Sequence, residues 1–159
     1  MPQPSAPADV VRAVAAGVSR LIAGNLTEPE KQAQLDRLAG LYAEHTDVRH
    51  PFAPLGDSPL RTRAELRRHF ADGPAQTRGA DRFEAVGEVH ETADPEVVIY
   101  EFSYVGSANG RPFRVPCIFV TRVRDGVIVE SRDYADHVEM ARAFGRLDQL
   151  ATALAAGPR

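Results

Sequence analysis

The stretch Val127–His137, V-I-V-E-S-R-D-Y-A-D-H, has the pattern of an apolar strand that carries an acid near its end. Side chains alternate between the two faces of a strand, which divides this stretch into two sets. The set predicted to face the core is Val127, Val129, Ser131 and Asp133. The set predicted to face away is Ile128, Glu130, Arg132 and Tyr134. The pattern therefore aims the Asp133 carboxylate into apolar surroundings.

A carboxylate in such a place is suited to proton transfer. Removing Asp133 from water disfavours its charged form and raises its pKa toward neutral pH, where a general acid or base works best. The alternative is that the strand ends before Asp133 and leaves a solvated carboxylate paired with a nearby arginine. The alternation of residues leaves both interpretations open.

Length and charge limit the classes of partner. The chain has 159 residues and a formal charge of −3, which suits one domain with a sizeable core and gives no broad basic field for nucleic acid. Cys117 is the single cysteine, so neither an intrachain disulfide nor a cysteine-built metal site is possible. Because no stretch resembles a signal peptide or a membrane span, we expect a cytoplasmic protein with no membrane partner.

Most helical signals lie before residue 80 or after residue 136. Residues 1–8 hold three prolines and no periodicity, which indicates a flexible tail before a single domain over residues 9–159. Capping-box patterns at Thr27 and Thr62 predict the starts of two helices. Apolar spacing predicts helices over residues 10–24, 28–42, from 63 onward, 137–144 and 147–154.

Strand signals fill the middle of the chain. Alternation or apolar runs predict strands over residues 46–52, 82–91, 97–105, 113–123 and from 127 onward. The sequences G-S-A-N-G at 106–110 and D-G at 125–126 predict hairpin turns. Both faces of the 97–105 strand are apolar, so we expect a homodimer that covers the outer face of the sheet. Helices beside a mostly antiparallel sheet define the α+β class.

This order of elements, with A-E-H-T-D-V-R-H-P-F at 43–52 and R-V-R-D-G-V-I-V-E-S-R-D-Y-A-D-H at 122–137, resembles the SnoaL-like group of the nuclear transport factor two superfamily. The resemblance covers about residues 9–150. It implies a cone-shaped α+β barrel: a curved, mostly antiparallel sheet wrapped by the N-terminal helices and closed by a C-terminal helix. This fold hosts polyketide cyclases, isomerases, epoxide hydrolases and non-enzymes, so the reaction must be argued from the site.

The resemblance also implies site residues. Asp133 matches the catalytic aspartate of an R-D-aromatic segment, and His50 occupies a first-strand position that is asparagine in those relatives. The second pocket histidine of the cyclases falls at Phe119, and the additional Arg and Asp of the epoxide hydrolases fall near Ser103 and Val105. Neither catalytic set is complete. The positions expected to contact substrate are Tyr42, Val48, Glu101, Ser103, Cys117 and Phe119, with Tyr42 either closing the pocket rim or serving as a core aromatic.

These residues favour an enzyme that needs no metal or cofactor. Asp133, helped by His50, would transfer a proton in the cyclisation, isomerisation or epoxide opening of a hydrophobic, oxygenated small molecule. One alternative is a dimeric binding module for an apolar ligand or a protein, which the apolar Phe119 favours. A third possibility is a structural dimer whose pocket is filled by its own side chains, such as Phe113 and Phe119.

Overall fold

The computed structural model describes residues 5–157, which form one curved sheet and a set of helices around it. In chain order the elements are α1 (Pro7–Ala23), α2 (Glu28–Gly40), β1 (Tyr42–Arg49), β2 (Leu60–Thr62), α3 (Arg63–Gln76), β3 (Ala80–Glu91), β4 (Val97–Ala108), β5 (Arg111–Arg124), β6 (Val127–Ala135), α4 (His137–Ala143) and α5 (Leu147–Ala155).

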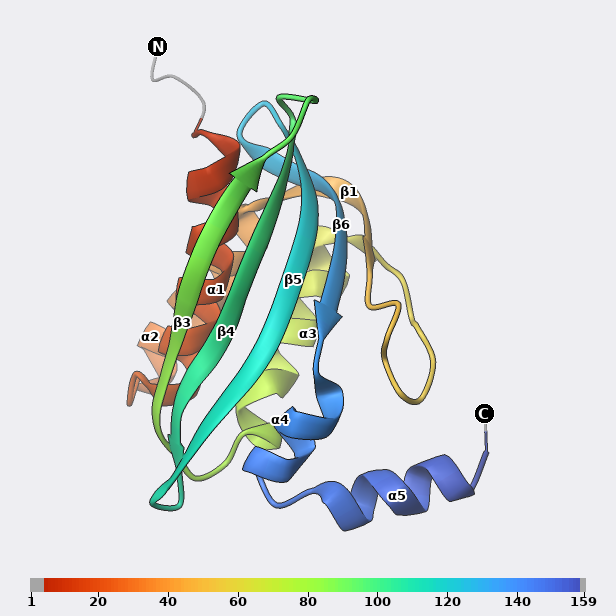
Figure 1. The fold of residues 1–159 in the computed structure, drawn as a ribbon. Coiled ribbons are helices and arrows are strands. Elements are labelled where there is room, and N and C mark those ends of the chain that lie inside the picture. The colour runs from red at the N-terminus through yellow and green to blue at the C-terminus, as the bar shows by residue number, and fades with distance from the viewer. Residues whose placement is uncertain (1–4, 158–159) are drawn as a thin grey trace.

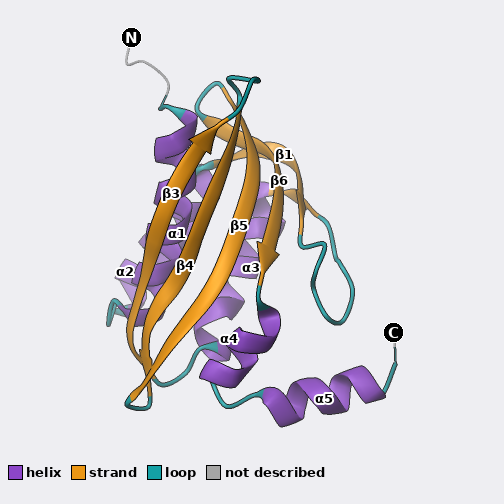
Figure 2. Cartoon of the chain, viewed as in Figure 1, coloured by secondary structure: helices purple, strands orange, loops and turns teal. Residues whose placement is uncertain are grey.

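The sheet is six-stranded, in the order β2-β1-β6-β5-β4-β3. Strands β1 and β6 run parallel, whereas all other neighbours run antiparallel. Helices α1, α2 and α3 lie behind one face, here called the inner face, and α4 lies across its lower end (Figure 1). No described helix covers the outer face, which Figure 2 presents to the viewer. The fold is therefore the predicted α+β type, with a sheet that curls without closing.

Two groups of buried side chains fill the space between the inner face and the helices. One group joins α1, α2 and α3 to β1 and includes Leu35, Leu38 and Leu66, each 1% exposed. The other joins α1 to β3, β4 and β5 through a cluster of aromatic rings around Phe102. The two groups meet where α1 crosses the sheet, since Val18 and Phe119 pack against both.

Both predicted capping boxes are present. The hydroxyl of Thr27 accepts a hydrogen bond from the backbone of Glu30, and the hydroxyl of Thr62 accepts one from the backbone of Glu65. Each glutamate side chain accepts a hydrogen bond from the backbone N–H of its threonine, so the first turns of α2 and α3 are fixed by local sequence.

The first strand begins earlier than predicted. Helix α2 ends at Gly40, and Tyr42, which the spacing assigned to that helix, is the first residue of β1. The strand then ends at Arg49, so His50 lies just beyond it rather than inside it. The physical reason is pairing with β6: Tyr42 lies opposite Ile128 in a parallel register that no local pattern reveals.

A bulge changes the faces of β6. Arg122 pairs with Glu130 and Val123 pairs with Ile128, which leaves Val129 as an extra residue. Ile128 is consequently buried on the inner face, and the assignment of Val127 and Val129 to the core face was wrong. Beyond the bulge the predicted alternation holds, so Ser131 and Asp133 are buried.

The ends of the chain differ in part from expectation. Residues 1–4 of the predicted tail lie outside the described residues, and Pro7 and Ala8 already belong to α1. The closing helix breaks at Gly145, as predicted, and continues as α5, which projects away from the sheet (Figure 1). None of the α5 residues is buried.

Candidate functional site

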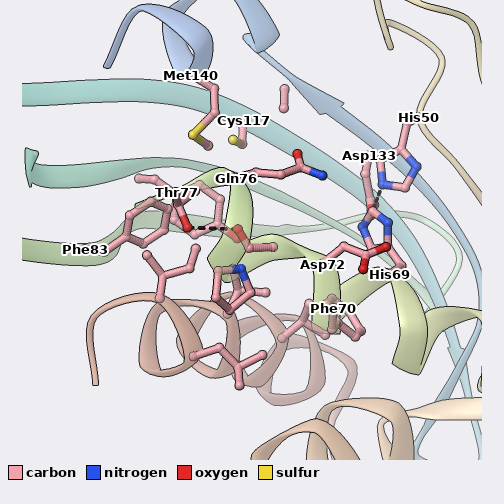
Figure 3. A pocket seen from close by; sticks show the side chains of 18 of the residues that line it. His50, His69, Phe70, Asp72, Gln76, Thr77, Phe83, Cys117, Asp133 and Met140 are labelled. Atoms are coloured by element: carbon pink, nitrogen blue, oxygen red, sulfur yellow. Dashed lines mark hydrogen bonds and ion pairs between the residues drawn. The ribbon is translucent and has the colours of Figure 1, made fainter. Parts of the chain in front are cut away.

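A cavity of about 280 Å³ opens between the inner face of the sheet and helices α1, α3 and α4. Most of its wall is apolar, with Val14 and Leu21 from α1, Phe70 from α3 and Met140 from α4. Figure 3 shows that Asp133, His50 and His69 gather at one end, whereas Phe83 and Met140 lie toward the other. An apolar molecule with a polar function at one end matches this division.

Asp133 is the acid of this cavity. It is 7% exposed, near the end of β6, and its Oδ1 atom accepts a hydrogen bond of 2.5 Å from the Ser131 hydroxyl. Burial raises the pKa of Asp133 to about 7, and the Ser131 hydrogen bond and the Arg132 charge limit that rise. Strand β6 continues to Ala135 with Asp133 buried, and Arg132 pairs with Asp47 at 2.9 Å, which contradicts the alternative of a solvated Asp133 held by an arginine. Asp133 can thus exchange a proton near neutral pH.

His50 is the nearest basic group to that carboxyl. Its Nε2 atom lies 3.8 Å from Oδ2 of Asp133, and its backbone N–H donates to Asp57, which anchors the turn after β1. Burial, together with the charges of His69 and His137, lowers the pKa of His50 to about 4. The imidazole is therefore neutral at pH 7, and the contact is not an ion pair at that pH.

Two further histidines line the cavity, and sequence reasoning gave them no role. The ring of His69, on α3, lies 5.1 Å from the ring of His50 and is more exposed. The Nε2 atom of His137, at the start of α4, is buried and has no hydrogen-bond partner among residues 5–157. Two positions in the sequence could have indicated that these histidines lie near the cavity. His137 follows Asp133 by four residues, and His69 precedes the buried Phe70.

Four of the predicted contact residues line the cavity: Tyr42, Val48, Cys117 and Phe119. Tyr42 is 2% exposed and lies deep in the wall, so it does not form a rim. Burial raises the pKa of Cys117 to about 12, which keeps its thiol protonated and unreactive. The ring of Phe119 packs edge-on against Phe102, with ring centroids 4.9 Å apart.

Glu101 and Ser103 do not line the cavity. Alternation along β4 turns Phe102 and Tyr104 inward, which places Glu101 and Ser103 on the outer face. There Glu101 is exposed and lies 3.3 Å from His90, and Ser103 is covered by the neighbouring strands. Their expected inward orientation was wrong. Both faces of β4 carry apolar residues, so alternation alone could not decide which face packs against the helices.

The part of the chain that the structure describes holds no group of three or more His, Cys, Asp or Glu residues arranged to bind a metal ion. Within the same residues, no helix has both the length and the apolar character needed to cross a membrane.

Comparisons with known proteins agree with this fold. A family model described as a SnoaL-like domain matches residues 28–131. The uncharacterised protein YesE of Bacillus subtilis (strain 168) is 36% identical over 109 residues, which cover 66% of this chain and 72% of YesE. The crystal structure of a Bacillus subtilis protein provisionally named an isomerase is 26% identical, with a TM-score of 0.68, over 88% of this chain and 94% of that one.

A further similarity concerns the fold alone. IdmH of Streptomyces antibioticus, provisionally named a polyketide cyclase, has a TM-score of 0.61 at 21% identity. The match covers 87% of this chain and 98% of IdmH.

Proposed function

Because this chain belongs to the SnoaL-like domain family, we propose that it is an enzyme that transfers protons on a small, hydrophobic, oxygenated molecule without a bound metal or cofactor. The observation that carries the proposal is a buried carboxyl, Asp133, that opens into an apolar cavity beside a neutral imidazole, His50. The candidate reactions are cyclisation, isomerisation and epoxide opening.

The chemistry follows from the two protonation states. Above its pKa, Asp133 takes an acidic proton from the carbon beside a carbonyl onto Oδ2, and the C–H electron pair moves into an enolate. The neutral His50 ring donates a hydrogen bond to the enolate oxygen. The enolate then attacks a second carbonyl in a cyclisation, or is reprotonated at another carbon in an isomerisation. Asp133 returns its proton in either case.

Epoxide opening would use the same groups differently. Asp133 would accept the proton of an attacking hydroxyl or water as the new C–O bond forms and the epoxide C–O bond breaks. A second proton donor would have to reach the leaving oxygen. Burial lowers the pKa of the His50 imidazolium to about 4, so near pH 7 the ring is neutral and has no acidic proton to give. Abstraction of a C–H proton therefore has better support from the site.

The test replaces Asp133 with asparagine and follows α-proton exchange. Deuterium incorporation into an apolar bicyclic ketone such as 2-tetralone, measured by NMR, reports proton abstraction without knowledge of the natural substrate. We expect Asp133→Asn to lose about 10²–10⁴-fold in exchange rate. Glu101→Gln removes a carboxylate from the outer face and should leave the rate unchanged. Undiminished exchange in Asp133→Asn would overturn the proposal.

A binding module is the second candidate, favoured by the apolar wall that Phe119 forms close to Asp133 on the paired strand. In that case an apolar ligand would bind wild type and Asp133→Ala with equal affinity and would be recovered chemically unchanged. Calorimetric titration with analysis of the recovered ligand separates the two functions.

The outer face supports a proposal about assembly: a second copy of the chain covers it. Val86 is 51% exposed and Ile118 is 42% exposed, and the same face carries acidic Glu101 and basic Arg114. Apolar residues mixed with both signs of charge suit a self-complementary two-fold contact. Light scattering should show a dimer for wild type and a monomer for Ile118→Asp; a monomeric wild type would contradict the proposal.

A further inference from the structure

Three buried polar side chains form a chain of hydrogen bonds behind the cavity. The Thr121 and Ser131 hydroxyls lie 3.0 Å apart across β5 and β6, and Ser131 lies 2.5 Å from Oδ1 of Asp133. Thr121 is 1% exposed and Ser131 is 2% exposed. Asp133 lines the cavity, whereas neither hydroxyl does. Ser131 therefore contacts the acid from outside the cavity wall, and Thr121 contacts Ser131.

The number of hydroxyl protons decides which group donates and which accepts in this row of hydrogen bonds. An ionised carboxylate only accepts, so the single hydroxyl proton of Ser131 is donated to Oδ1. Ser131 then has no proton left for its other neighbour, and Thr121 must donate to the Ser131 oxygen. Every hydroxyl proton in the chain thus points toward Asp133, and each bond strengthens the next.

The two carboxyl oxygens consequently differ. Oδ1 accepts the Ser131 bond, whereas Oδ2 faces the His50 ring at 3.8 Å. We propose that Ser131 and Thr121 are positioning residues, which hold Oδ1 out of the reaction and leave Oδ2 as the atom that takes and returns the proton. This inference rests on the proposed function for the identity of the reaction, but the hydrogen-bond chain itself can be tested without a substrate.

Other charged or titratable groups also face Asp133 from the surrounding elements. They are Tyr42 on β1, His50 just after β1, His69 and Asp72 on α3, Tyr104 on β4, Cys117 on β5, His137 on α4 and Arg146 before α5, while Arg132 acts through its charge from the other face of β6. Among residues 5–157, Ser131 is the only one that forms a hydrogen bond with the Asp133 side chain. The loss of that bond should therefore disfavour the ionised carboxylate and raise its pKa.

The experiment is a pH titration of the Asp133 carboxyl carbon by NMR in protein labelled with ¹³C at the aspartate carboxyl. The signal is assigned by its loss in Asp133→Asn. We expect Ser131→Ala to raise the pKa of Asp133 by about one to two units, because the variant lacks the hydrogen bond that favours the ionised carboxylate. Thr121→Val, which keeps the shape of the side chain, should raise it by a few tenths of a unit, and Thr121→Ser should restore the wild-type value.

The matched control is Ser103→Ala, which removes a buried serine hydroxyl on the outer face, away from the carboxyl. An unchanged titration in Ser131→Ala, or an equal shift in Ser103→Ala, would overturn the inference. If Ser131→Ala does not fold, the Thr121→Val and Thr121→Ser pair decides the matter by the presence or absence of a shift and its rescue.

The enzymatic readout separates this inference from the proposed function. If ketone exchange occurs, Ser131→Ala should lower kcat near neutral pH and shift its rise to higher pH with little change in KM. A titration that shifts as expected in a protein that exchanges no ketone would retain the hydrogen-bond chain and reject the function. Ketone exchange in wild type, with no shift in the pKa of Asp133 in the variants, would retain the function and reject the role of the hydrogen bonds.

Discussion

The Nε2 atom of His50 lies 3.8 Å from Oδ2 of Asp133, and burial moves the pKa values of the two groups in opposite directions. The carboxyl rises to about 7 and the imidazole falls to about 4, so their order is the reverse of that in water. Between about pH 4 and about pH 7 the pair holds one titratable proton, which is on the Asp133 carboxyl. Above the higher value the carboxylate is ionised beside a neutral ring, which is the state of a general base.

The first prediction concerns the pH dependence of exchange. Because only the ionised carboxylate accepts a proton, kcat/KM for ketone exchange should rise through a single ionisation near pH 7 and then level off. His50→Gln should lower the plateau by about 10-fold or more, through the loss of an oxyanion donor, and keep one rising limb. Exchange rates measured across the pH range by NMR check this.

The control for that variant is His45→Gln, which alters an exposed histidine of β1 outside the cavity wall. A bell-shaped profile that loses one limb in His50→Gln would show instead that a protonated imidazole takes part.

The second prediction concerns stability. A carboxyl with a folded pKa near 7 and an unfolded pKa near 3.9 binds more protons in the native state between these values. Its contribution to the free energy of unfolding is complete below about pH 4 and is lost as the pH rises through 7. Asp133→Asn should therefore be more stable than wild type by about 2–4 kcal/mol at about pH 8, and equal to it near pH 4.

Urea unfolding of both proteins at several pH values measures this difference. The comparison must be between variant and wild type, because His50, with a lowered pKa, makes stability rise with pH from about 4 to 6.5 and opposes Asp133. For Ser103→Ala, which removes no titratable group, we expect a difference from wild type that does not change with pH. A constant difference between Asp133→Asn and wild type would mean that the carboxyl is not desolvated.

Local patterns were sufficient for most of the fold. The capping boxes at Thr27 and Thr62 start α2 and α3, and the pairs Asn109-Gly110 and Asp125-Gly126 form hairpin turns in which all four residues have positive φ. Such signals depend on neighbours in sequence, so they can be interpreted without the tertiary structure.

The candidate site depended on contacts between distant segments. Asp133 lies on the predicted face of β6 only because the bulge at Val129 precedes it. His69 and His137 reach the cavity from α3 and α4, and no spacing in the sequence relates either helix to the turn that carries His50. Strand alternation identified the acid, whereas the convergence of the histidines required the packed helices.

The third prediction concerns Cys117, which lines the same cavity. The thiol is 3% exposed and its pKa is about 12, so almost no thiolate is present near pH 8. Iodoacetamide should leave the folded protein unmodified over hours, whereas the protein in denaturant should be alkylated fully, as mass spectrometry would show. Rapid alkylation of the native protein would indicate that the cavity opens to solvent more widely than the structure shows.

The last prediction tests the close approach of β3 to β4 beside the cavity. Gly106 lies opposite Phe83 in this pair, and a Cβ atom at Gly106 would collide with the backbone carbonyl of Arg82. Phe83 lines the cavity, so a shift of β3 would also move the wall. Gly106→Ala should therefore lower the free energy of unfolding by about 1–3 kcal/mol, as overpacking typically does.

The matched variant for this test is Gly40→Ala at the end of α2, where a Cβ atom would meet no atom within 4 Å. There we expect no loss and a gain of up to about 1 kcal/mol, because alanine restricts the unfolded chain. Urea unfolding followed by circular dichroism compares the two. Equal stability of Gly106→Ala and Gly40→Ala would mean that β3 can move away from β4 without cost, and that the wall formed by Phe83 is not held by the sheet.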